Sequence, residues 1–112
     1  MREIAGDDYQ VRVEDQRVHF SGVLRLPGPA YGPISDLLQD VAQSAAGEVQ
    51  VDLRALLFVN SAGINVLYRF AIALRKKGGT RLVVLGAESI GWQQRSLRNL
   101  SHFHSDLDLQ FS

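Results

Sequence analysis

The chain lacks cysteine and carries no excess of charge of either sign. Its 112 residues include no cysteine, 12 Lys and Arg residues and 12 Asp and Glu residues, for a formal net charge of zero. Without thiols it can form neither a disulfide framework nor a thiolate-ligated metal site. Balanced charge gives no electrostatic footprint for nucleic acid and no attraction to an anionic membrane surface. We therefore expect no nucleic-acid partner and no membrane partner.

Long hydrophobic runs are also missing. Residues 1–10 are rich in charge and lack the apolar segment of a signal peptide, and no later run approaches the length that spans a bilayer. Hydrophobic residues still make up 46% of the chain, enough for one core at a length typical of one domain. We expect a single cytoplasmic domain over residues 1–112, with residues 1–8 as a flexible or edge segment.

Hydrophobic periodicity predicts a mixed α/β fold. Apolar residues alternate from Tyr9 and again from Val18 around a polar turn, which predicts a hairpin. The continuous run 82–85 is typical of a strand covered on both faces. The expected elements are strands at 9–14, 18–26, 49–53, 82–85 and 107–111, a loop at 54–60, and helices at 33 to about 47, 61–77 and 89 to about 100. This order predicts a mixed β-sheet in which an N-terminal hairpin is followed by parallel strand-helix-strand units.

One segment carries a recognisable motif. Residues 51–64, VDLRALLFVNSAGI, resemble the central signature of STAS domains, the anti-sigma-factor-antagonist (anti-anti-sigma factor) family. In that pattern an apolar strand ends in Asp-Leu, a short loop holds an aromatic residue, and Asp-Ser-Ser/Thr-Gly-Leu opens a long helix. The order of elements matches over about residues 9–111, and the specific part is residues 51–67. The resemblance implies a single-domain bacterial STAS protein with that fold.

The resemblance also implies a function. Such proteins act in partner switching: they bind a kinase-like anti-sigma factor or related switch kinase, which phosphorylates a serine and so ends the complex. A PP2C-type phosphatase restores the binding form. By position the serine is Ser61. Two departures stand beside it, since Asn60 replaces the usual Asp and Ala62 replaces Ser or Thr. The resemblance implies no catalytic site and no cofactor, and it leaves the oligomeric state open.

The chemistry of Ser61 fits this reading. We expect Ser61 to be the N-cap of its helix, where its side chain accepts from the N–H of Gly63 or Ile64. A helix start also tolerates a phosphate, whereas added charge in a packed interface would weaken binding. Gly63 would let another backbone approach closely. The alternative is that Ser61 is only a helix cap.

The partner-binding face is expected on the same helix. Asn65, Arg69 and Ile72 share a narrow stripe with Ser61. The alternative is that Ile72 is an ordinary exposed apolar residue. The expected partner-binding residues are Asn60, Ser61, Ala62, Gly63, Asn65, Arg69 and Ile72.

Other candidate sites are weaker. His102 and His104, with the carboxylate of Asp106 close in sequence, are conceivable metal ligands. The sequence provides no firm third ligand beside the two histidines, so a solvated helix end is expected. Arg95 and Arg98 form a small basic face. No Lys-Ser/Thr phosphate loop or Gly-x-Ser-x-Gly elbow is present. Two alternative functions stay open: a constitutive scaffold subunit without phosphorylation, and a small nucleotide-binding α/β module with a polar pocket at the strand ends.

Overall fold

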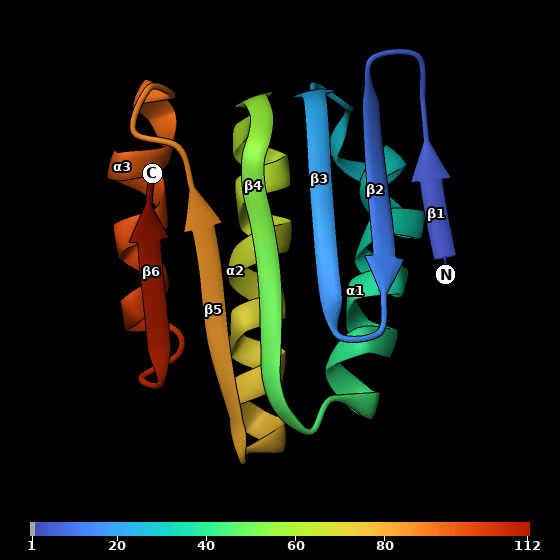
Figure 1. The fold of residues 1–112 in the computed structure, drawn as a ribbon. Coiled ribbons are helices and arrows are strands. Elements are labelled where there is room, and N and C mark those ends of the chain that lie inside the picture. Colours follow the sequence, from blue (N-terminus) through green and yellow to red (C-terminus); the bar gives the residue numbers. More distant parts are fainter. Residues whose placement is uncertain (1) are drawn as a thin grey trace.

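The computed structural model describes residues 2–112, which form one mixed sheet and its helices (Figure 1). The elements are β1 (Arg2–Ala5), β2 (Tyr9–Glu14), β3 (Arg17–Leu24), a 3-10 turn (Gly28–Tyr31), α1 (Gly32–Ser44), β4 (Gly47–Val59), α2 (Ser61–Lys77), β5 (Thr80–Gly86), α3 (Gly91–Leu97), a second 3-10 turn (Arg98–His102) and β6 (Leu107–Phe111). The strands lie in the order β1-β2-β3-β4-β5-β6. β1, β2 and β3 are antiparallel neighbours, and β3 to β6 run parallel. The predicted fold class is confirmed.

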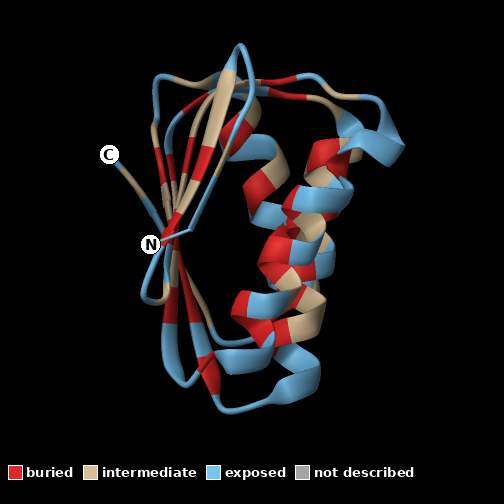
Figure 2. Cartoon of the chain, turned by 90° about the vertical axis from the view of Figure 1, so that its right-hand side faces the viewer, coloured by how far each residue is buried: buried red, intermediate tan, exposed pale blue. Residues whose placement is uncertain are grey.

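All three α-helices lie on one face of the sheet, and the other face is uncovered (Figure 2). The core therefore sits between the helix layer and the inward side chains of the strands. Its largest fully buried side chains are Phe70, Ile34, Leu38, Leu53, Leu56, Leu74, Leu82 and Leu97. The run 82–85 was predicted to be a strand covered on both faces, but the helices cover only one of them. Val83 points away from the helices but is still buried, which explains why the run is continuously apolar.

The longest strand, β4, contains the main error of the sequence-based prediction. Residues 54–60 were expected to form a loop, but β4 continues to Val59. Buried residues alternate as far as Leu53 and then recur every third position, at Leu56 and Val59. The register with β3 shifts twice over this stretch, so β4 has one extra residue at each shift. Each bulge turns two consecutive residues to the uncovered face, which removes the alternation that identifies a strand.

The helix boundaries show smaller differences. α2 spans Ser61–Lys77 as expected. α1 ends at Ser44, before the expected boundary near Gly47, because Gly47 with a φ of 77° already begins β4. The third helix was expected to begin at residue 89, but α3 begins at Gly91, and its N-cap Ile90 has no side-chain cap bond. The last part of the expected third helix is the 3-10 turn at Arg98–His102.

The edges of the sheet are formed by the two ends of the chain. β1 pairs with β2 on one side only, so the segment expected to be flexible or an edge contributes an edge strand. β6 forms the opposite edge beside β5. Within residues 2–112, no helix combines the length and the apolar character needed to cross a bilayer.

Candidate functional site

The start of α2 is capped by Asn60 and not by Ser61. Asn60 has extended backbone angles, and its Oδ1 accepts a hydrogen bond from the N–H of Gly63 at 3.0 Å. The N–H of Ile64 donates to the main-chain carbonyl of Asn60. Both donors assigned to Ser61 are therefore taken by its neighbour. The prediction of Ser61 as the N-cap is wrong, because an asparagine one position earlier serves equally well in that role.

Asn60 also connects α2 to the segment before α1. The hydroxyl of Tyr31 donates to Oδ1 of Asn60 at 2.7 Å, and Nδ2 of Asn60 donates to the carbonyl of Leu26 at 2.8 Å. Burial raises the pKa of Tyr31, so its hydroxyl retains the proton that it donates. The main-chain N–H of Asn60 donates to the carbonyl of Leu24 at the end of β3. An aspartate could not make the donation to Leu26, which gives a physical reason for the first departure from the family pattern.

Gly63 is enclosed by the molecule itself. A Cβ atom at this position would lie 2.3 Å from Cγ2 of Val59 and 2.7 Å from the hydroxyl of Tyr31. Gly63 is also buried. The missing side chain therefore allows α2 to pack on Tyr31 and β4, whereas the sequence suggested that it lets a partner backbone approach.

Ser61 is exposed in the first turn of α2. Within residues 2–112 its hydroxyl makes no hydrogen bond and has no capping role. This finding removes the alternative in which Ser61 serves only as a helix cap. Ala62 beside it is half-buried and packs against the core.

The predicted partner-binding stripe of α2 faces outward for most of its length. Asn65 and Arg69 are exposed, and Ile72 is half-buried. Asn65 lies one turn after Ser61, and Arg69 one turn further, so the three side chains share one side of the helix. The structure thus places Ser61, Asn65 and Arg69 on one accessible strip and turns Gly63 inward.

Two exposed apolar residues that precede Ser61 in the chain were missed by the sequence-based prediction. Leu57 is 62% exposed and Phe58 is 38% exposed, and both lie near the end of β4. The guanidinium of Arg25 stacks over the Phe58 ring at 4.9 Å. The other two apolar residues of this stretch, Leu56 and Val59, are buried. We call Ser61, Asn65 and Arg69 the α2 docking strip.

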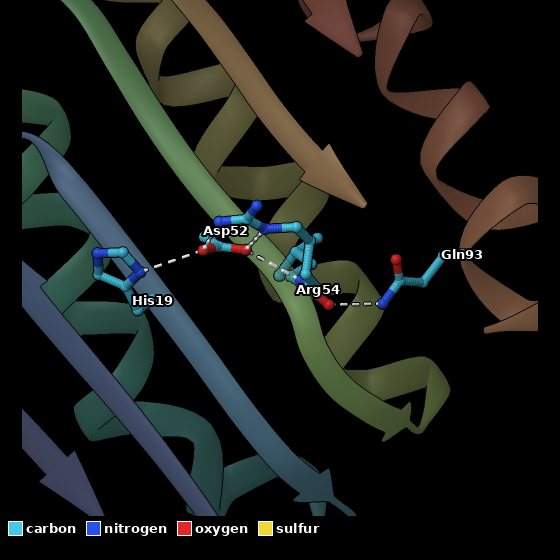
Figure 3. Close-up of polar contacts among 5 residues, drawn as sticks. His19, Asp52, Arg54 and Gln93 are labelled. Carbon is cyan, nitrogen blue, oxygen red and sulfur yellow. Dashed lines mark hydrogen bonds and ion pairs between the residues drawn. The ribbon is translucent and has the colours of Figure 1, made fainter. Parts of the chain in front are cut away.

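A buried glutamine holds this part of β4 in place. Nε2 of Gln93 on α3 donates to the carbonyls of Leu53 and Leu56, at 2.6 and 3.1 Å. Its Oε1 accepts from the N–H of Ala87 at 2.8 Å. Gln93 has no exposed surface, and Figure 3 shows it reaching from α3 to the irregular part of β4. These bonds lie beyond Asp52, the last residue of β4 that pairs with β5, and so provide partners for carbonyls past the end of that ladder. Trp92 beside it donates to the carbonyl of Leu56 at 3.3 Å and packs at the edge of the core.

The histidine segment at the C-terminal end is divided between surface and interior. His102 is exposed, whereas His104 is buried and its Nδ1 accepts from the N–H of Asp106 at 3.2 Å. The expectation of a solvated helix end holds for His102 and fails for His104. Burial lowers the pKa of His104. Within residues 2–112, no group of three or more His, Cys, Asp or Glu side chains could hold a metal ion.

The architecture matches solved structures of one class, small proteins with an anti-sigma-factor-antagonist-like (STAS-like) fold. The matches include two structures of SiaC from Pseudomonas aeruginosa, one of them described as apo-SiaC. Apo-SiaC matches with a TM-score of 0.68 and 11% identity, over 98% of this chain and 99% of that one. The second matches with a TM-score of 0.68 and 13% identity, over all of both chains. At these identities the likeness establishes the fold. No family model and no curated protein sequence matches the chain.

Proposed function

We propose that the chain is a cytoplasmic signalling module that binds a kinase-like anti-sigma factor or switch kinase through the α2 docking strip while Ser61 is unphosphorylated. Phosphorylation of Ser61 ends the complex, and a PP2C-type phosphatase reverses it. The observation that carries the proposal is the exposed hydroxyl of Ser61, unbonded within residues 2–112 and placed in the first turn of α2. The resemblance of residues 51–64 to the STAS signature and the STAS-like fold support the same assignment.

The position of Ser61 suits a phosphorylated residue. Asn60 provides the cap, so modification of Ser61 does not remove a bond that holds α2. The N–H groups of Ser61 and Ala62 are at the positive end of the helix dipole, where a phosphate is tolerated. The isolated domain should therefore keep its fold when it is phosphorylated.

The surroundings of Ser61 explain why the modification would end binding. Leu57 and Phe58 offer apolar surface that a partner can bury. A phosphate adds about −1.5 to −2 charges, together with water that the interface would have to accommodate or remove. A penalty of about 1.4 kcal/mol already lowers affinity tenfold, so the switch needs no change of fold.

Mass measurement after incubation with a kinase-like anti-sigma factor or switch kinase tests the proposal. With ATP, we expect one added phosphate in the wild type and none in Ser61→Ala. Ser35→Ala is the matched control, because Ser35 also lies near the start of a helix and should leave phosphorylation unchanged. Phosphate at another residue, or none at all, contradicts the switch.

A constitutive scaffold is the second candidate function. The observation that favours it is the engagement of Asn60, whose side chain is bonded to Tyr31, Leu26 and Gly63 and offers no carboxylate to a kinase. In that case the α2 docking strip would bind its partner equally with and without ATP. The mass measurement separates the two candidates, since the scaffold predicts binding without phosphate.

A further inference from the structure

The uncovered face of the sheet contains a polar pocket where β2, β3 and β4 lie side by side. Its volume is about 370 Å³, within the range of small-molecule sites. It is lined mainly by Gln10, Arg12, His19, Ser21, Asp52 and Arg54. Figure 3 shows His19, Asp52 and Arg54 gathered on this face of the neighbouring strands. The pocket lies on the opposite side of the sheet from the helices.

The first bulge of β4 forms the pocket. His19 pairs with Asp52 and Ser21 pairs with Ala55, so one residue of β3 faces two of β4 between these pairs. Arg54 and Ala55 are consequently both exposed on the uncovered face. The small side chains of Ser21 and Ala55 leave the space empty beside the long side chains of Arg12 and Arg54.

The charges in the pocket are unequally paired. Asp52 holds Arg54 through two side-chain bonds, from Nε at 3.0 Å and from Nη2 at 2.9 Å. His19 Nδ1 lies 3.4 Å from the same carboxylate. The hydrogen bonds from Arg54 lower the pKa of Asp52, which therefore stays ionised and neutralises Arg54.

Arg12 is left without a partner among residues 2–112. Its Nε is buried and makes no hydrogen bond. Glu3 pairs with Arg12 in the register of β1 and β2, but the two side chains form no ion pair. The terminal nitrogens of Arg12 also have no hydrogen-bond or ion-pair partner among these residues, so the guanidinium at the pocket favours an acceptor supplied from outside.

We propose that this pocket binds a small organic oxyanion, such as a carboxylate or a phosphate monoester, with Arg12 as its main anchor. The two terminal nitrogens of a guanidinium form a fork that matches two oxygens of such a group. Gln10 and Ser21 supply neutral hydrogen-bonding groups for the rest of the ligand. The site is separate from Ser61 and does not depend on its phosphorylation.

Asp52 does not prevent anion binding. A free carboxylate would repel the ligand, but this one is bonded to Arg54 and faces His19. Arg12, Arg54 and Asp52 together carry one positive charge, which suits a singly charged oxyanion. The ion pair also fixes Arg54 in place at the rim of the pocket.

Backbone amide NMR spectra during separate titrations with inorganic phosphate and with acetate test the proposal, with sodium chloride at equal ionic strength as the reference. We expect saturable shifts at Gln10, Arg12, His19 and Ser21. Saturation with phosphate alone identifies a phosphate ligand, and saturation with acetate alone identifies a carboxylate. Shifts that do not saturate with either anion, or that equal those with chloride, overturn the proposal. Shifts confined to Ser61 and Ala62 also overturn it.

Variants assign the binding to Arg12. Arg12→Gln should weaken binding at least about tenfold, whereas Arg95→Gln, which removes an exposed charge on α3, should bind as the wild type does. Ala55→Glu places a carboxylate at the exposed rim without touching the core and should also weaken binding about tenfold or more. Wild-type affinity in Ala55→Glu and in a folded Arg12→Gln would overturn the assignment.

Discussion

The hydroxyl of Tyr31 donates a hydrogen bond to Oδ1 of Asn60 over 2.7 Å, so the turn that precedes α1 fixes the start of α2. The side chain of Asn60 also accepts a hydrogen bond from the N–H of Gly63, which caps α2, and donates one to the carbonyl of Leu26. One residue thus holds the loop after β3, the end of β4 and the helix that carries Ser61.

Asn60→Asp tests this connection. The aspartate keeps the cap but cannot donate to Leu26, and it turns a charge toward that carbonyl. We expect a loss of about 1–3 kcal/mol in the free energy of unfolding, measured with urea. The control is Asn65→Asp, which makes the same change at an exposed site one turn later and should stay within about 0.5 kcal/mol. Equal stability of the two variants would refute the connection.

Gly63→Ala tests the packing of α2 on Tyr31. Alanine is the better helix former by about 1 kcal/mol, yet its Cβ would lie 2.3 Å from Val59 Cγ2. We expect a net loss of about 1–3 kcal/mol in thermal or urea unfolding. Gly91→Ala is the control, since nothing lies within 4 Å of a Cβ there at the start of α3. A stabilised Gly63→Ala variant would show that the helix start has room to move.

Gln93→Leu tests how the bulged strand is held. Leucine fills similar space but leaves the carbonyls of Leu53 and Leu56 and the N–H of Ala87 without this partner. We expect a loss of about 2–4 kcal/mol in unfolding free energy and faster amide exchange over residues 54–59. Gln94→Leu alters the exposed neighbour and should change neither. Unchanged exchange in Gln93→Leu would mean that the bulges hold without it.

Ser61 variants test the switch by affinity. Ser61→Asp adds charge within the α2 docking strip and should weaken partner binding at least about tenfold, measured by calorimetry. Ser61→Ala should bind as the wild type does and respond no longer to ATP. Ser35→Asp provides the control for added charge on a different helix. Wild-type affinity in Ser61→Asp would count against the switch, although a carboxylate carries less charge than a phosphate.

His104 should make stability depend on pH. Its pKa is lowered mainly by burial, with Arg75 adding to the effect and Asp106 opposing it. The unfolded chain therefore binds a proton more readily than the folded protein below the ordinary value of 6.5. The contribution of His104 to the free energy of unfolding is therefore fully present above that pH, and it is lost as the pH falls toward the lowered pKa of the folded protein. Urea unfolding between neutral and acidic pH should show this slope in the wild type and in His102→Gln, and a reduced slope in His104→Gln.

The regular parts of the fold could be predicted from the sequence, because their side chains follow a single period. α2 and β6 match their predicted ranges, since an apolar stripe or a simple alternation continues to their ends. The second half of β4 could not be recognised, because two bulges replace the period of two by a period of three. A pairing partner creates that pattern, and the sequence of one strand does not contain it.

The candidate site was predictable in position but not in detail. The motif located Ser61 at the start of a long helix, where the structure places it. Which residue caps the helix depended on Tyr31 and Leu26, which lie far away in sequence and meet Asn60 only in the folded chain. The exposure of Leu57 and Phe58, and the pocket around Arg12, both follow from the bulges and were missed with them.

The three-residue spacing of β4 also limits how the chain length can vary. Leu56 and Val59 face the core only because each bulge inserts one residue between them and Leu53. Substitutions at Leu57 or Phe58 alter the surface alone, whereas a single deletion there would turn Val59 outward and rotate the start of α2 with it. The segment before Ser61 should therefore tolerate a new side chain far better than a lost residue.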